Sequence, residues 1–278
     1  MPATLEAGRT LSVRGHDVYV HEQGDGFPLL ILNGIGGNTD MLDTAVASLA
    51  EGSRTIAFDA PGTGRSATPH FPLTIAAVAE LARDLLVELG LPEADVLGFS
   101  HGGLVAQELA RLAPRRVRRL ALVSTACGWG SSLGDPAALS LLLTPLRYYS
   151  RSFNERTSAL YGERDRVVDA TLREARLGSP PSALGYAYQL LAAATWSSLP
   201  WLGTLRQPTL VISGGEDRVT VPANGVQLAR LIPNSRLHVL PGEGHLTLLD
   251  PESAAIPLLA DFFSVPELAT ASSWAAAA

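Results

Sequence analysis

A serine between two glycines stands where a predicted strand meets a predicted helix, and this arrangement restricts the fold more than any other stretch. Residues 98–102 read Gly-Phe-Ser-His-Gly and follow the apolar run 94–97, while the residues after them have apolar positions at helical spacing. In such a turn the serine takes a strained backbone conformation that lifts its hydroxyl above the sheet edge. We therefore predict that Ser100 occupies a strand-to-helix turn, in which Gly98 and Gly102 leave room for neighbouring backbone.

Strands and helices alternate along most of the chain. Apolar runs predict buried strands at 28–32, 55–58, 94–97, 120–124, 209–212 and 236–240. Helical spacing of apolar residues predicts helices at 41–49, 74–89, 224–231 and 254–263, besides the helix that follows Ser100. Residues 16–22 alternate between apolar and polar side chains, which predicts an edge strand or a hairpin arm. The alternation of strands and helices along the chain is typical of an α/β fold with a mostly parallel sheet and helices on both faces.

The alternation is interrupted after residue 124, because roughly 80 residues precede the next strand, far more than a structureless connection spans in a compact domain. Helix-like segments lie in this insert at 137–146, 167–177 and 184–194. The insert also contains three of the four tryptophans and five of the six tyrosines. We therefore expect a helical cap at 127–205, a core formed by 1–126 and 206–264, and a low-complexity tail at 265–278.

The composition excludes several classes of protein. A formal net charge of −6 disfavours nucleic-acid binding, which requires a basic face, and we interpret the arginine cluster at 115–119 as a solvated helix end. The single cysteine, Cys127, allows no intrachain disulfide. Residues 1–10 lack the apolar core of a signal peptide, and no apolar run is long enough to span a bilayer. The expected location is cytoplasmic.

An acid and a histidine that could activate Ser100 both follow predicted strands in the second half of the chain. A serine hydroxyl is a poor nucleophile until a base takes its proton and a third group orients that base. Asp217 lies just past strand 209–212, and His245 lies in a glycine-rich loop past the last strand. We assign Ser100 as nucleophile, His245 as general base and then acid, and Asp217 as the orienting carboxylate, with the adjacent Glu216 as the alternative.

Two backbone N–H groups are predicted to stabilise the oxyanion of such a reaction. One belongs to His101, the residue after the nucleophile, and the other to Ile35 in the loop after strand 28–32. We expect the His101 side chain itself to pack beside the turn. Substrate contact is assigned to Asn33 and to four cap aromatics, Trp129, Tyr186, Trp196 and Trp201. For any one of these aromatic residues, fastening the cap to the core is the alternative role.

These features together resemble the α/β-hydrolase superfamily over residues 16–263. Within it the chain is most similar to the intracellular medium-chain-length polyhydroxyalkanoate depolymerases. The resemblance is carried by Asn33-Gly34-Ile35-Gly36, Pro145-Leu146-Arg147-Tyr148, Gly185-Tyr186, Gln189-Leu190, Trp196, Ser198, Trp201-Leu202 and 207–211. One position departs from that family, because His101 stands where those depolymerases tend to have tryptophan.

The resemblance implies an α/β-hydrolase fold whose helical cap is inserted between the sixth and seventh strands. It implies a serine hydrolase that cleaves the ester bonds of a storage polyester through Ser100, Asp217 and His245, with no cofactor and no metal. It also implies a hydrophobic ester or polyester as substrate and association of the cap with the surface of storage granules.

Four alternatives remain open at this point. A carboxylesterase or lipase on monomeric acyl esters and a carbon–carbon bond hydrolase use the same fold. A dinucleotide-binding oxidoreductase is the third, because glycine-rich residues 34–39 follow a strand and Asp59 ends the next one, although Thr39 replaces the third glycine of that fingerprint. The fourth is a non-catalytic binding protein, against which the complete set of Ser100, Asp217 and His245 argues.

Overall fold

The computed structural model describes residues 8–162, 170–265, 268 and 274, and within them one sheet has the strand order β1-β2-β4-β3-β5-β6-β7-β8. The strands are β1 Arg9–Val13, β2 His16–Gln23, β3 Phe27–Leu32, β4 Ser53–Phe58, β5 Ala94–Phe99, β6 Val117–Val123, β7 Thr209–Gly214 and β8 Ser235–Leu240. From β4 to β8 neighbouring strands run parallel, whereas β2 is antiparallel to β1 and β4. The α/β-hydrolase fold and the hairpin arm at 16–22 are thus confirmed, with β1 at the edge.

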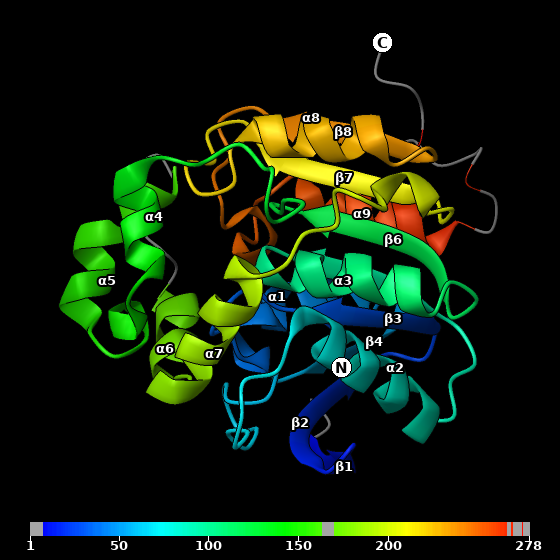
Figure 1. Ribbon diagram of the computed structural model, residues 1–278, viewed down its shortest axis with the longest axis horizontal. Helices are drawn as coiled ribbons and strands as arrows, with labels where there is room; N and C mark the ends of the chain where they lie inside the picture. Colours follow the sequence, from blue (N-terminus) through cyan, green and yellow to red (C-terminus); the bar gives the residue numbers. More distant parts are fainter. Residues whose placement is uncertain (1–7, 163–169, 266–267, 269–273, 275–278) are drawn as a thin grey trace.

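Helices cover both faces of this sheet (Figure 1). They are α1 Asp43–Leu49, α2 Ile75–Glu88, α3 His101–Leu112, α8 Pro222–Leu231 and α9 Ala255–Ser264. One apolar core forms between the sheet and α2, α3 and α8, and a second forms between the opposite face and α1 and α9. The central strands β3 to β7 are largely buried between these two layers, which is why they contain continuous apolar runs.

The insert between β6 and β7 is helical, as expected, and its helices gather at one end of the sheet, on the left in Figure 1. They are α4 Pro136–Leu142, α5 Arg151–Thr157, α6 Ala170–Gly178 and α7 Ala183–Ala194, with short 3₁₀ turns at Pro145–Tyr148, Ser158–Tyr161 and Leu202–Thr204. The sequence pattern missed α5, and the first part of the predicted segment 167–177 lies outside the described residues. The exact boundaries of core, cap and tail stay a prediction.

Arg118 and Arg119 of the arginine cluster at 115–119 are not part of a solvated helix end, so that interpretation was wrong for these two residues. Arg119 is 4% exposed and donates to the carbonyls of Phe262 at 2.6 Å and Val265 at 2.7 Å. These carbonyls lie where α9 ends and helix carbonyls have no partner within the helix. Arg118 forms two hydrogen bonds to the buried carboxylate of Asp95. The cluster therefore joins β5, β6 and α9.

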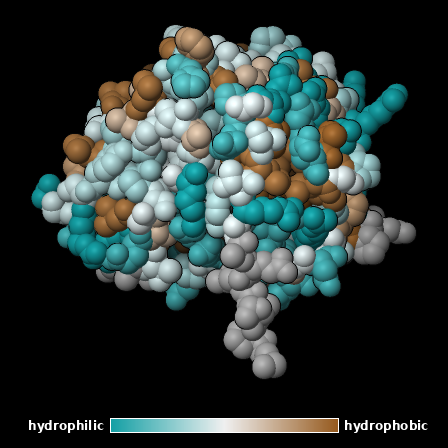
Figure 2. Space-filling model, turned by 90° about the horizontal axis from the view of Figure 1, so that it is seen from below, coloured by the Kyte–Doolittle hydropathy of each residue, from teal (hydrophilic) through white to brown (hydrophobic). Residues whose placement is uncertain are grey.

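The surface on the side of β1 and β2 mixes hydrophilic and hydrophobic side chains. Figure 2 shows one larger hydrophobic patch on this face, bordered by hydrophilic residues. Among the described residues, no helix combines the length and the apolar character needed to cross a membrane.

The two glycines of the serine turn are required by close backbone packing. A Cβ on Gly102 would lie 2.1 Å from the carbonyl oxygen of Leu32, and one on Gly98 would lie 2.6 Å from the Cα of Gly103. Neither contact can be relieved without moving β3 or α3. The space predicted from the sequence is therefore present.

We expect Gly102→Ala to lower the free energy of unfolding by about 3 kcal/mol, because the new methyl group overlaps rigid backbone. The matched control is Gly178→Ala at the exposed end of α6, where a Cβ meets nothing within 4 Å. This control should change stability by less than about 0.5 kcal/mol. Urea denaturation of the three proteins measures both values, and equal stability of Gly102→Ala and the wild type would contradict the packing argument.

Candidate active site

Ser100 lies between the end of β5 and the start of α3 in a strained conformation, with φ 52° and ψ −118°. Non-glycine residues rarely take positive φ, and the surrounding structure must supply the energy that holds them there. The Ser100 N–H donates to the carbonyl of Val123 at 2.9 Å, and its carbonyl accepts from the Thr125 hydroxyl at 2.6 Å. The turn is thus held by the neighbouring strand β6 and the loop after it.

The structure brings the three predicted catalytic side chains into one hydrogen-bonded chain. The Oγ of Ser100 lies 3.0 Å from Nε2 of His245, and Nδ1 of His245 lies 2.9 Å from Oδ2 of Asp217. Asp217 and His245 are only 2% and 4% exposed. A base within hydrogen-bond reach of a hydroxyl, and oriented on its far side by a buried carboxylate, is the geometry that activates a serine.

Asp217 is itself held in place by residues that follow it in the same loop. Its Oδ1 accepts from the N–H groups of Val219 at 2.8 Å and Thr220 at 2.9 Å, and its Oδ2 accepts from the Thr220 hydroxyl at 2.7 Å. The sequence reasoning missed Thr220. The spacing of an aspartate and a threonine three residues apart is a capping pattern that could have indicated it. His245 is oriented by Asp217 rather than by the alternative acid, Glu216.

Tyr161, from the cap, holds His245 in place. The His245 N–H donates to the Tyr161 carbonyl at 2.8 Å, and the two rings stack with centroids 6.3 Å apart. Phe99 lies on another side of the imidazole, at 5.6 Å between ring centroids. No sequence pattern marked Tyr161, because its position depends on how the cap packs against the core.

The loop that carries Ile35 is also fastened by the cap. The Ile35 carbonyl accepts from the Tyr148 hydroxyl at 2.5 Å and from Arg147 at 3.3 Å, and the Gly36 N–H donates to the Gln189 side chain at 2.7 Å. Within the described residues, no acceptor bonds to the N–H of Ile35 or of His101. Both predicted oxyanion donors are therefore available beside the Ser100 turn.

A pocket lies over Ser100 and His245, and Asn33 and Ile35 are in its wall. The Asn33 amide donates to the Asn38 carbonyl at 2.7 Å and accepts from the Gly34 N–H at 2.7 Å. It therefore shapes the wall while its polar atoms are used within the loop.

The four cap aromatics that we assigned to substrate contact line neither the pocket over Ser100 nor the apolar pocket that adjoins it. Tyr186 is buried, packs against the loop at Gly36 and donates to the Leu142 carbonyl at 2.9 Å. The Trp196 indole donates to Glu108 of α3 at 3.0 Å, and its ring meets Trp201 edge-on at 5.9 Å. Trp129 is 71% exposed and donates to the Ala194 carbonyl. These contacts match the alternative role, attachment of the cap.

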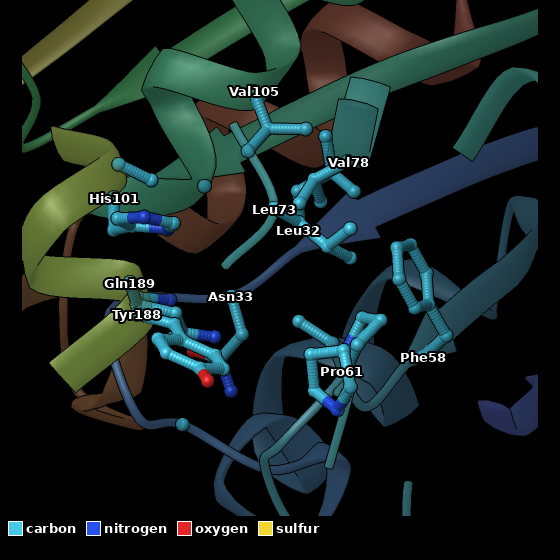
Figure 3. A pocket seen from close by; sticks show the side chains of 16 residues that line it. Leu32, Asn33, Phe58, Pro61, Leu73, Val78, His101, Val105, Tyr188 and Gln189 are labelled. Carbon is cyan, nitrogen blue, oxygen red and sulfur yellow. The ribbon is translucent and has the colours of Figure 1, made fainter. Parts of the chain in front are cut away.

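A second, largely apolar pocket adjoins the first and shares Asn33 with it. Figure 3 shows His101, Tyr188 and Gln189 on one side of this pocket and apolar side chains on the other. Those labelled apolar side chains are Leu32, Phe58, Pro61, Leu73, Val78 and Val105. His101 packs beside the turn as expected, and its Nε2 has no hydrogen-bond partner among the described residues.

Burial lowers the pKa of the His101 imidazole from 6.5 to about 4. In the unfolded chain this histidine takes up a proton below about pH 6.5, whereas the folded one stays neutral until about pH 4, so acid favours unfolding in that window. Between pH 7 and pH 5 this histidine should cost the wild type about 2 kcal/mol of folding stability. We expect His101→Met to be free of that part of the loss. Urea denaturation at both pH values measures this difference. His70→Gln, at an exposed site, should keep the wild-type loss; an unchanged loss in His101→Met would contradict the assignment.

Asp59, the acid that a dinucleotide would require at its ribose, is not free to bind one. It is 0% exposed, and its carboxylate accepts from the N–H groups of Thr39 at 2.6 Å and Arg65 at 2.8 Å. This carboxylate fixes two loops at the strand ends and does not support the oxidoreductase alternative.

Comparison with known proteins gives the class that this fold and site define. Residues 28–252 match the alpha/beta hydrolase fold family, and the chain belongs to that family. A poly(3-hydroxyalkanoate) depolymerase from Ectopseudomonas oleovorans is 35% identical over 239 residues, which cover 84% of this chain and 83% of the relative. The predicted resemblance is therefore confirmed.

Two further relatives show how wide the family is. A 2-hydroxymuconate semialdehyde hydrolase from Pseudomonas putida is 30% identical over 275 residues, 93% of this chain and 95% of that protein. The crystal structure of a hydrolase from Pseudomonas aeruginosa PA01 superposes with a TM-score of 0.79 at 26% identity, covering 94% of this chain and 100% of that one.

Proposed function

We propose that this protein is a serine hydrolase that cleaves carboxylic ester bonds through an acyl-enzyme, and that its substrate is a medium-chain-length polyhydroxyalkanoate. The observation that carries the proposal is the hydrogen-bonded chain Ser100–His245–Asp217 beside the two unbonded N–H groups of Ile35 and His101. Nucleophile, base, orienting acid and oxyanion donors are the complete set that acyl transfer requires.

In the first half-reaction, Ser100 Oγ attacks the ester carbonyl while His245 Nε2 takes its proton. The carbonyl oxygen becomes an oxyanion and accepts hydrogen bonds from the N–H groups of Ile35 and His101. Asp217 stabilises the imidazolium through Nδ1–H. His245 then gives its proton to the leaving alkoxide, the C–O bond breaks, and the alcohol departs.

In the second half-reaction, water attacks the acyl-enzyme. His245 takes a proton from the water, the same two N–H groups stabilise the second oxyanion, and the proton returns to Ser100 as the acid leaves. The product is a free carboxylic acid. These steps use only side chains and backbone groups of this chain.

Three observations support a polyester with apolar side chains as the substrate. The depolymerase relative is named for poly(3-hydroxyalkanoate). The sequence carries the cap residues of the resemblance, such as Arg147 and Tyr148, which here hold the Ile35 loop. The apolar pocket in Figure 3 is suited to an alkyl side chain. Cytoplasmic location and association with the storage-granule surface are part of this proposal.

The second candidate is hydrolysis of a carbon–carbon bond, which the name and the 30% identity of the Pseudomonas putida relative favour. A carboxylesterase or lipase on monomeric esters would use the same half-reactions with a smaller substrate.

Initial rates on three kinds of substrate separate these candidates. They are emulsified medium-chain polyester, p-nitrophenyl esters from acetate to laurate, and 2-hydroxymuconate semialdehyde. We expect turnover of the polyester and faster cleavage of the octanoate than of the acetate ester. Fast cleavage of short esters without polymer turnover would overturn the polyester assignment, and turnover of the semialdehyde alone would establish the second candidate.

A further inference from the structure

The pocket over Ser100 contains a buried cation that the half-reactions above do not use. Arg176, on α6, lines this pocket and is fully buried. Its Nη1 donates to the neutral side chain of Asn154 at 2.9 Å, and its Nε is buried without a hydrogen-bond partner among the described residues. An unsatisfied donor on a buried charge costs considerable free energy unless a ligand completes it.

Among the described residues, the positive charge in this wall has no acidic partner. Arg147 lines the same pocket, is 4% exposed and donates to the carbonyls of Leu141 and Ile35. Within the described part of the chain, neither Arg147 nor Arg176 forms an ion pair, although many exposed arginines do. The rings of Tyr148 and Tyr161 lie 5.9 and 6.0 Å from the Arg176 guanidinium and offset only part of the cost of burying its charge. Buried charges in proteins are normally paired.

A second unsatisfied donor lies in the same wall. The hydroxyl of Tyr161 is buried and has no hydrogen-bond partner among the described residues. Tyr161 and Arg176 both line the Ser100 pocket, and the guanidinium lies 6.0 Å from the centre of the tyrosine ring. A carboxylate accepts hydrogen bonds from both kinds of donor and also neutralises the charge.

We propose that Arg176 and Tyr161 form a subsite for a free carboxylate on the ester substrate. The proposal rests on ester hydrolysis at Ser100 and specifies its substrate class, an ester that carries a carboxylate within reach of the scissile bond. In a polyester of hydroxy acids this group is the carboxylate at the end of the chain. Arg147 adds to the positive potential and keeps the Ile35 loop in position.

Paired substrates test the subsite. We would measure kcat/KM for cleavage of the ester bond between the two units in the dimeric ester of 3-hydroxyoctanoic acid and in its methyl ester, in which the free carboxylate is masked. The wild type should favour the free acid. Arg176→Gln should lose about 10- to 100-fold on the free acid and less than about 3-fold on the methyl ester, because only the former makes the charged hydrogen bond. Arg176→Lys should restore part of the difference.

Two more variants distinguish loss of the subsite from loss of folding. Tyr161→Phe removes the hydroxyl but keeps the ring and the carbonyl that contact His245, so it should lower the ratio of the free-acid rate to the methyl-ester rate. Arg151→Gln is the matched control, since Arg151 is an exposed cap arginine that pairs with Glu174. It should leave both rates unchanged. Equal losses on both substrates in Arg176→Gln and Tyr161→Phe would overturn the carboxylate subsite.

Equilibrium binding separates failure of this subsite from failure of the proposed function. Calorimetry on the Ser100→Ala protein would compare octanoate with octanol. Octanoate should bind more tightly, and Arg176→Gln should abolish the difference. Such selectivity without ester turnover by the wild type would support the subsite and refute ester hydrolysis. Ester turnover with equal binding of the two ligands would support ester hydrolysis and refute the subsite.

Discussion

Ser100→Ala should lower kcat on p-nitrophenyl octanoate by at least about 10⁴-fold, because the substitution removes the only atom that forms the acyl-enzyme. Ser100 Oγ lies 3.0 Å from His245 Nε2, so the wild type needs no rearrangement before proton transfer. The remaining activity would come from substrate binding and from the two N–H donors, which can still stabilise the oxyanion when water attacks the ester directly.

The same variant should fold normally. Ser100 has positive φ, and alanine tolerates that strain about as well as serine does. The turn is held by main-chain contacts, from the Ser100 N–H to Val123 and from Thr125 to the Ser100 carbonyl, which the substitution leaves intact. Circular dichroism and thermal unfolding provide the control. Substantial activity in a pure, folded Ser100→Ala protein would refute the mechanism.

Asp217→Asn should lower kcat by about 10³- to 10⁴-fold, because an amide can donate to His245 Nδ1 and thereby favour the tautomer that cannot accept the serine proton. The carboxylate is also the acceptor for the N–H groups of Val219 and Thr220, and the amide oxygen can keep those bonds. The effect should therefore fall on kcat while folding is retained.

Glu216→Gln is the matched control for this prediction, since Glu216 is the neighbouring acid that the sequence left as an alternative. It should keep activity within about 3-fold of the wild type, because the carboxylate hydrogen-bonded to His245 Nδ1 is that of Asp217. Stopped-flow or steady-state rates on p-nitrophenyl octanoate measure both variants. A large loss in Glu216→Gln with an active Asp217→Asn would show that Glu216, and not Asp217, orients His245.

The parts of the site that follow strands could be predicted because a parallel sheet brings its strand ends together. Ser100, Asp217 and His245 lie in the segments that follow β5, β7 and β8, so their order along the chain and the fold class determine that they meet. Ile35 was predicted on the same ground, from the loop after β3. The glycines at 98 and 102 were predicted from sterics alone, and the structure shows the contacts that require them.

The parts contributed by the cap could not be predicted in this way. Tyr161, Arg176 and Gln189 reach the site from helices or turns whose packing direction no apolar period specifies. Conversely, an aromatic-rich insert suggested a substrate surface, yet Trp196 and Trp201 pack toward α3 and Arg111. An amphipathic pattern shows which face of a helix is buried, but does not show whether that face meets the core or a ligand.

The cap therefore contacts both loops that carry proposed catalytic groups. Tyr161 holds the backbone of His245, and Tyr148 holds the carbonyl of Ile35. The same segment supplies Arg176 and Tyr161 to the proposed carboxylate subsite, so substrate recognition and positioning of the base share one element.

The most direct test of the central claim is release of 3-hydroxyalkanoic acids from amorphous medium-chain polyester granules, with the wild type and Ser100→Ala compared at equal concentration. We predict release by the wild type and none above background by the variant, measured by chromatography of the soluble acids. No release by a wild-type protein that still cleaves p-nitrophenyl octanoate would contradict the polyester assignment, and equal release by both proteins would contradict the serine mechanism.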